Sequence, residues 1–207
     1  LPKWFTEMNI HDITQADIQK LVNEYAEDHS PKSTRNMHGL VSAIMSLNRP
    51  NMVIRTTLPQ KALYEPYIPT ESDIKTILKH AEGTEWEIGL WLAVFGLRRS
   101  EILALQYPDD LEGNTLHINK ALVTNSDDEY VIKTTKTTDS TRDIYLPDNL
   151  VAKIHAKKSF VNGHPNSLCD YLTDTEKALG LPHFSLHKLR HYYASMAHTM
   201  GIPDSYI

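Results

Sequence analysis

Three polar side chains near the end of the sequence fall on one face of an expected helix. His187, Arg190 and His191 stand at positions i, i+3 and i+4, and residues at these spacings are neighbours on a helix surface. A guanidinium is a permanent planar cation that can bind two phosphate oxygens at once, and an imidazole exchanges protons near neutral pH. The face therefore suits a bound phosphate, although the triplet taken alone is better explained as a solvated polar face.

A zinc site is a second chemistry that these histidines suggest, because His183, His187 and His191 are spaced by four. No acidic residue is in step with them, and no pair of closely spaced cysteines accompanies them. Arg190, between two of the histidines, would repel a cation. We therefore predict no metal site here.

Two further cations lie where a phosphate could meet them. Arg98 precedes an expected helix that begins near Ser100, and the free N–H groups at a helix N-terminus favour an anion. Glu101, three residues past Arg98, can hold its guanidinium in place. Lys136 lies at the tip of the expected hairpin VIKTTKTTDSTRDIYLP. Taken singly, Arg98 is also explained as a surface residue of a turn, and Lys136 as a solubilising residue.

Together, these segments resemble the sequence boxes of the tyrosine recombinases, also called phage integrases. FGLRRSEILAL is similar to the family's TGLR-x-SE-[IL]-L-x-L box, and HKLRHYYAS is similar to its H-x-LRH-x-x-AS box. A hairpin lysine followed by I-x-LP lies between the two boxes, in the family's order. The sequence departs from the pattern at Phe95, where Thr or Ala is usual, and at Lys188, where Asp is frequent. Neither is a catalytic position of the family.

The resemblance implies that the protein cleaves and rejoins DNA through a 3′-phosphotyrosine link. No ATP, metal or other cofactor is implied, because the covalent link conserves the energy of the broken bond. The arginines of the family bind the non-bridging phosphate oxygens, its lysine protonates the leaving 5′-oxygen, and its histidine transfers a proton near the attacking tyrosine. The catalytic positions carried over are Arg98, Lys136, His187 and Arg190. The supporting positions are Glu101 and His191.

The resemblance assigns the nucleophile to no residue of this sequence. The family's tyrosine lies well beyond the second arginine, whereas Tyr206 follows Arg190 too closely. Tyr192 and Tyr193 fall within the expected helix of Arg190 itself. We therefore expect a fragment, shortened at both ends, that does not cleave DNA as it stands.

The implied partner is double-stranded DNA, at attachment or recombination sites. Full-length members act as homotetramers on DNA that are held together largely by exchange of C-terminal segments, so this fragment is expected to be monomeric. A phage or mobile element in the bacterial cytoplasm is the expected setting. The alternatives are a non-cleaving DNA-binding relative or truncated regulator of the same fold, a type IB topoisomerase and, more distantly, a metal-dependent hydrolase.

The elements that must position these residues follow from hydrophobic periodicity. Helical spacing predicts two helices before Pro50 and further helices near 70–80, 86–95, 100–105, 148–160, 167–179 and 185–200. A period of two predicts three or four short strands near 116–118, 122–123, 130–132 and 144–146. The fold class is therefore mainly α with a small antiparallel β-sheet (α+β). The resemblance implies a tyrosine recombinase catalytic fold preceded by a small helical, SAM-like core-binding domain.

The segment TTLPQKALYEPYIPT contains three prolines without periodicity and predicts a domain boundary. We expect a partial helical core-binding domain over 1–58 and a linker over 59–69. The catalytic domain would then cover 70–207, without the C-terminal segment that carries the nucleophile.

Composition alone does not indicate a DNA-binding protein. The net charge is -5, and the acidic residues concentrate in the middle third of the chain. The single cysteine, Cys169, excludes an internal disulfide, fits a reducing cytoplasm and is interpreted as a small core residue. No apolar run approaches the roughly 18 residues that a membrane span needs.

Overall fold

The computed structural model describes residues 1–60, 67–134, 141–161 and 163–203. Within the chain, two compact units form, Leu1–Glu65 and Pro66–Ile207, and each is described by itself. The division between them falls inside the proline-rich segment. No helix of the described residues is long and apolar enough to cross a membrane.

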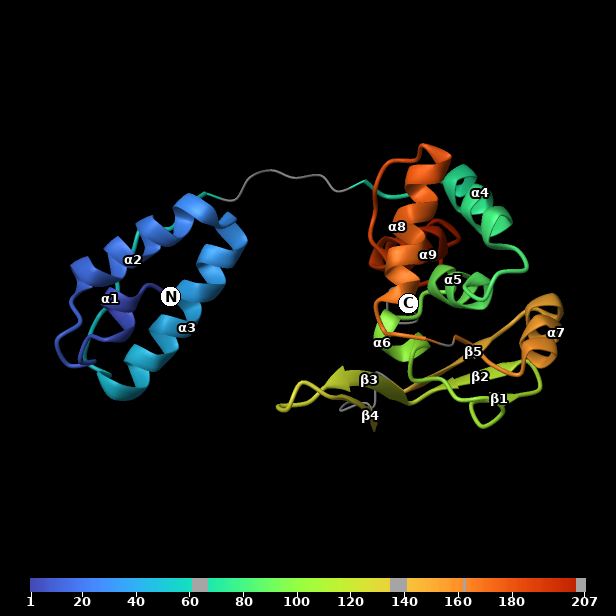
Figure 1. The fold of residues 1–207 in the computed structure, drawn as a ribbon, viewed down its shortest axis with the longest axis horizontal. Helices are drawn as coiled ribbons and strands as arrows, with labels where there is room; N and C mark the ends of the chain where they lie inside the picture. Colours follow the sequence, from blue (N-terminus) through green and yellow to red (C-terminus); the bar gives the residue numbers. More distant parts are fainter. Residues whose placement is uncertain (61–66, 135–140, 162, 204–207) are drawn as a thin grey trace. The chain divides into compact units, whose positions relative to one another are not determined.

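The first unit is helical (Figure 1), with α1 (Lys3–Thr6), α2 (Gln15–Asp28) and α3 (Pro31–Asn48). The residues at the starts of α2 and α3 suit a helix N-terminus. The Thr14 side chain accepts from the Asp17 backbone N–H, and the Asp17 carboxylate accepts from the Thr14 N–H, which satisfies two free donors at the helix start. Pro31 occupies the first turn of α3, where its missing N–H is not needed.

These helices enclose a small core of their own. Its buried members are Phe5, Ile13, Ile18, Leu21, Val22, Met37, Val41 and Met45. Burial of such a face, rather than helix propensity, stabilises helices of this length in water.

The second unit holds the remaining helices and all strands of the described residues. The helices are α4 (Glu71–Ala81), α5 (Glu87–Val94), α6 (Arg99–Ile102), α7 (Asp148–Lys157), α8 (Ser167–Leu179) and α9 (Leu186–Thr199). Figure 1 shows the strands gathered on one side of this unit, with α5 and α6 between them and the helices α4, α8 and α9. Helix α7 is shorter than the predicted 148–160 because Lys158 takes a left-handed conformation at φ 52, which lets Phe160 enter the core.

The strands form two small antiparallel sheets instead of the one expected. Strands β1 (Leu111–Glu112), β2 (Thr115–Ile118) and β5 (Arg142–Tyr145) make one sheet in the order β1-β2-β5. Strands β3 (Lys120–Thr124) and β4 (Tyr130–Thr134) make a separate hairpin. Leu116 and Ile118 of β2 are buried and pair with Ile144 and Arg142 of β5. The long-range pairing of β2 with β5 keeps this face against the core, so the intervening hairpin forms its own sheet.

Helix α5 lies at the centre of the second unit and explains how the site is held. Ile88, Leu90 and Leu92 have no exposed surface, as expected for a helix that is apolar nearly all round. It contacts α4, α6, α7 and α9. The segments that carry the candidate residues, α6 and α9, are therefore both fixed against one buried helix.

Candidate active site

The turn that follows α5 presents Arg98. The chain reverses at Gly96, whose φ of +87 is accessible to glycine at little cost, and buried Leu97 anchors the turn. Arg98 then takes an extended conformation as the N-cap of α6. Its guanidinium donates to Glu101 Oε1 at 2.7 Å, and its backbone N–H donates to Glu101 Oε2 at 2.8 Å. The Arg98 side chain remains 48% exposed, so it is held but can still meet a ligand.

A second arginine, which was not predicted from the sequence, binds the same carboxylate. Arg142, at the start of β5, donates from Nη1 to Glu101 Oε1 at 3.1 Å and from Nη2 to Oε2 at 2.8 Å. A signal was present, because Arg142 and Ile144 fall on the same face of the strand. An arginine on an apolar face needs a buried partner, and Glu101 is that partner.

Glu101 remains an anion although it is almost fully buried. Burial by itself would raise its pKa, but the hydrogen bonds from Arg142 and from the Arg98 backbone and side chain outweigh this effect and lower the pKa below the ordinary value. A charged carboxylate is the form that holds two guanidiniums. The cluster of Arg98, Glu101 and Arg142 is therefore a fixed charge network.

Arg190 joins the site from α9. Its Nη1 donates to the carbonyl oxygen of Gly96, which ties α9 to the turn before Arg98. The approach is close, because a Cβ at Gly96 would lie 2.8 Å from Cδ1 of Tyr193. Burial first, and then the charges of Arg98 and Arg142, lower the pKa of Arg190, yet an arginine stays protonated at any physiological pH. Three guanidiniums are thus near enough to repel one another.

His187 and His191 flank Arg190 on the same helix. Their rings meet edge to face, with centroids 4.7 Å apart. Burial, followed by the charges of His191, Arg190, Lys188 and Arg98, lowers the pKa of His187. Near neutral pH His187 is therefore mostly neutral and able to accept a proton. A bound anion would reverse part of this shift.

The chain matches no family model and no curated protein, but its fold matches solved integrase structures. One is a Tn1549 transposon integrase in complex with transposon right end DNA, with a TM-score of 0.73, 15% identity, and coverage of 95% of this chain and 76% of that chain. A second structure of the Tn1549 integrase, in complex with circular intermediate DNA, has a TM-score of 0.74 and 15% identity, and the match covers 96% of this chain and 77% of that chain. A lambda integrase tetramer bound to a Holliday junction has a TM-score of 0.66 and 16% identity, and the match covers 94% of this chain and 62% of that chain.

The chain has the tyrosine recombinase fold. At these identities the match concerns the arrangement of the backbone. The predicted fold class, mainly α with a small antiparallel β-sheet (α+β), is confirmed, with the strands divided between two sheets.

Lys136 lies outside the described residues, so its place in a tyrosine recombinase fold stays a prediction. The described strands on either side of it are β4, which ends at Thr134, and β5, which begins at Arg142. Because Arg142 contacts Glu101, the strand that follows the lysine segment is attached to the Arg98 cluster.

The remaining histidine of the four-residue repeat has a separate partner. His183 Nδ1 lies 2.7 Å from Oε2 of the buried Glu176, and Glu176 Oε1 accepts from the Phe184 backbone N–H. This arrangement fixes the segment before α9. Among the described residues, no cluster of three His, Cys, Asp or Glu side chains could hold a metal ion.

Two tyrosines of α9 lie close to the site and serve as packing residues. The Tyr193 ring faces Gly96, and Tyr192 packs against the main core. Tyr206 lies outside the described residues. Cys169 is partly buried on α8 and packs against the same core, in agreement with its interpretation as a small core residue.

Proposed function

We propose that this chain is part of a site-specific DNA recombinase, an integrase of a phage or mobile element, which cleaves and rejoins DNA through a 3′-phosphotyrosine intermediate. One observation carries the proposal: Arg98, Arg190 and His187 converge around a single turn in the tyrosine recombinase fold. Solved structures of similar fold include integrases in complex with DNA.

The proposed roles follow from charge. Negative charge grows on the non-bridging oxygens when a phosphodiester becomes five-coordinate, and Arg98 and Arg190 are cations fixed before the reaction begins. His187, mostly neutral in the free site, would take the proton of the attacking tyrosine. Lys136 would protonate the leaving 5′-oxygen. Glu101 would hold Arg98, and His191 would support His187.

No metal or cofactor is required by this scheme. The arginines supply the cationic charge, and the phosphotyrosine link stores the bond energy until the strand is rejoined. The histidine and lysine supply proton transfer.

We propose that the nucleophilic tyrosine comes from outside these 207 residues and that this piece alone does not cleave. The placement of the tyrosines nearest the site supports this view, because the ring of Tyr193 is packed on Gly96 and that of Tyr192 on the core. The partner would be double-stranded DNA in the bacterial cytoplasm. The complete protein would act as a tetramer on DNA, and this piece alone would be a monomer.

The test uses the gene-encoded protein that contains these residues and a duplex selected for binding from random-sequence DNA. We expect a covalent protein–DNA adduct on a denaturing gel, with the protein on the 3′-phosphate. Arg190→Ala should abolish the adduct while duplex binding stays within about tenfold, because the lost interaction strengthens in the transition state. The matched control is Arg99→Ala, since Arg99 bonds Asn166 on the protein surface.

Three other outcomes would redirect the assignment. Binding without an adduct would favour a non-cleaving DNA-binding relative or regulator. Relaxation of supercoils without strand exchange would favour a topoisomerase. Equal loss of binding and adduct formation in Arg190→Ala would make Arg190 a structural residue.

A further inference from the structure

The carboxylate of Glu101 uses all of its hydrogen-bonding capacity on two arginines. Oε1 accepts from Nη1 of Arg98 at 2.7 Å and from Nη1 of Arg142 at 3.1 Å. Oε2 accepts from the Arg98 backbone N–H at 2.8 Å and from Nη2 of Arg142 at 2.8 Å. A carboxylate offers about four acceptor positions, so this one is saturated and cannot rotate without losing bonds.

We propose that Arg142 is a positioning residue, which acts through Glu101 to keep the Arg98 guanidinium turned toward a bound phosphate. The proposal rests on the proposed function and adds a residue to which no role in the site was assigned. Arg142 itself need not touch the DNA.

The first reason is the charge balance of the cluster. Arg98 and Glu101 alone would neutralise each other, and a neutral pair attracts a phosphate weakly. With Arg142 present, two cations share one anion, and a positive charge remains. Arg142 is 25% exposed and Arg98 is 48% exposed, so the more accessible guanidinium belongs to Arg98.

The second reason is what Glu101 would do without Arg142. Its side chain is 2% exposed, and a buried carboxylate with unfilled acceptor positions is costly. The nearest remaining donor is Arg98. The carboxylate would compete with the phosphate for that guanidinium and draw it inward.

The third reason is where Arg142 is fixed. Its backbone pairs with Ile118 in the central strand of the three-stranded sheet, and its bidentate bond reaches Glu101 on α6. The bond therefore ties the turn of Arg98 to the sheet. The strand so tied is the one that follows the segment of Lys136.

The test compares single-turnover cleavage of two substrates by the gene-encoded protein. One carries the ordinary scissile phosphodiester. The other carries a methylphosphonate, in which a methyl group replaces a charged non-bridging oxygen. The negative charge that Arg98 would stabilise is then absent. A residue that acts through Arg98 matters only for the first substrate, whereas a residue that merely maintains the fold matters for both.

We expect Arg142→Ala to slow cleavage of the phosphodiester by about 10- to 100-fold and to stay within about threefold of the unaltered protein on the methylphosphonate. Arg142→Lys, which keeps a cation but loses the planar fork, should retain part of the lost rate. The double variant with Arg98→Ala should be no slower than Arg98→Ala alone, because both changes act on one interaction.

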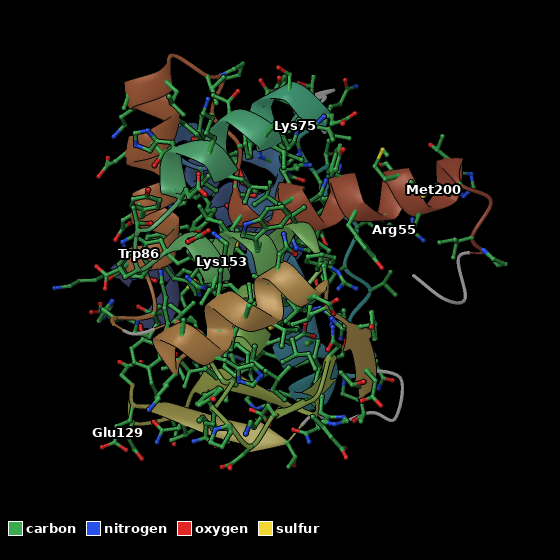
Figure 2. The ribbon with its side chains drawn as sticks, turned by 90° about the vertical axis from the view of Figure 1, so that its right-hand side faces the viewer. Arg55, Lys75, Trp86, Glu129, Lys153 and Met200 are labelled. Atoms are coloured by element: carbon green, nitrogen blue, oxygen red, sulfur yellow. The ribbon has the colours of Figure 1, made fainter. Side chains whose placement is uncertain are left out.

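Lys153→Ala supplies the matched control. Lys153 also bonds a buried glutamate, Glu87, at 2.5 Å, and Figure 2 shows it on α7, on the side of that helix nearest α5. Its removal should affect both substrates equally, through stability alone.

Equal losses on both substrates for Arg142→Ala, or no loss on the phosphodiester, would overturn the inference. These outcomes differ from failure of the proposed function, in which the unaltered protein cleaves neither substrate and the inference falls with it. Arg142→Lys and a thermal melt of each variant separate a loss of folding from a loss of positioning.

Discussion

At the scale of single residues, the site is a concentration of positive charge before any ligand arrives. Arg98 and Arg142 bind one buried anion, Glu101, and Arg190 lies near all three charges. The positive charges of Arg98 and Arg190 act on the titratable neighbour, His187. A bound phosphate would relieve the repulsion among these arginines, because its negative charge offsets theirs. The free protein therefore favours the neutral imidazole that a proton acceptor needs.

The protonation of His187 should change the stability of the fold with pH. Its folded pKa is depressed, first by burial and then by the nearby cations, so the unfolded chain binds more protons. The stabilising contribution of the neutral imidazole is present above its unfolded pKa and is lost as the pH falls through the folded pKa. His117 should behave oppositely, because its hydrogen bond with Asp143 raises its pKa. An NMR titration should find His187 protonating at lower pH than His117, and the reverse order would contradict the charge network.

Adding inorganic phosphate or duplex DNA to the same titration separates the two histidines further. The pKa of His187 should rise, because the anion offsets the arginines, whereas the pKa of His117 should not move. A rise at both residues would indicate a general salt effect instead.

The sequence predicted most of these residues but not their network. Arg98, Glu101, His187 and Arg190 stand in the two segments that resemble the boxes of the tyrosine recombinases, so they could be named in advance. Arg142 ends a run rich in Lys, Thr and Ser that looks solvated. Its role depends on the pairing of β2 with β5, across an intervening hairpin, and such long-range pairing is not encoded in local alternation. The role of Lys136 stays a prediction.

At the scale of elements, the contact between α5, its following turn and α9 sets the geometry. Helix α5 was predictable because it is apolar all round. The closeness of α9 to the turn was not, since it depends on a missing side chain at Gly96. Tyr193 occupies the space that a Cβ would need.

Gly96→Ala should therefore destabilise the second unit and displace Arg190. The new Cβ would meet Tyr193 Cδ1 at 2.8 Å at a φ of +87, and we expect a loss of about 2–4 kcal/mol in urea unfolding from strain plus overpacking. Gly83→Ala is the control, because Gly83 has a φ of +79 and nothing within 4 Å of the added carbon. It should show the backbone cost alone, about 1 kcal/mol. Equal losses of unfolding free energy in the two variants would mean that the close contact between Gly96 and Tyr193 of α9 adds nothing to the cost of the substitution.

At the scale of the whole chain, the net charge of -5 and the cationic site act in opposite directions on DNA. The overall charge repels the duplex, and local phosphate contacts must overcome that repulsion. Each neutralised phosphate releases counterions, so binding should depend steeply on salt.

We expect the affinity of this chain for duplex DNA to fall by at least about tenfold between roughly 50 and 200 mM salt, with a linear log–log plot. Arg190→Ala should reduce the slope of the log affinity against log salt plot by about one, the value expected for one lost phosphate contact. Fluorescence anisotropy can measure this change. A flat profile would count against DNA as the partner.

The two arginine anchors also differ in how they withstand sequence change. Arg190 is held by the Gly96 carbonyl, a group of the peptide backbone that no substitution removes. Arg98 is held by the Glu101 side chain, which a single codon change can delete. Among diverging descendants of this chain, the contact that holds Arg98 should therefore be lost before the contact that holds Arg190. Descendants that keep the α9 arginine but have lost Glu101 should be more common than the reverse.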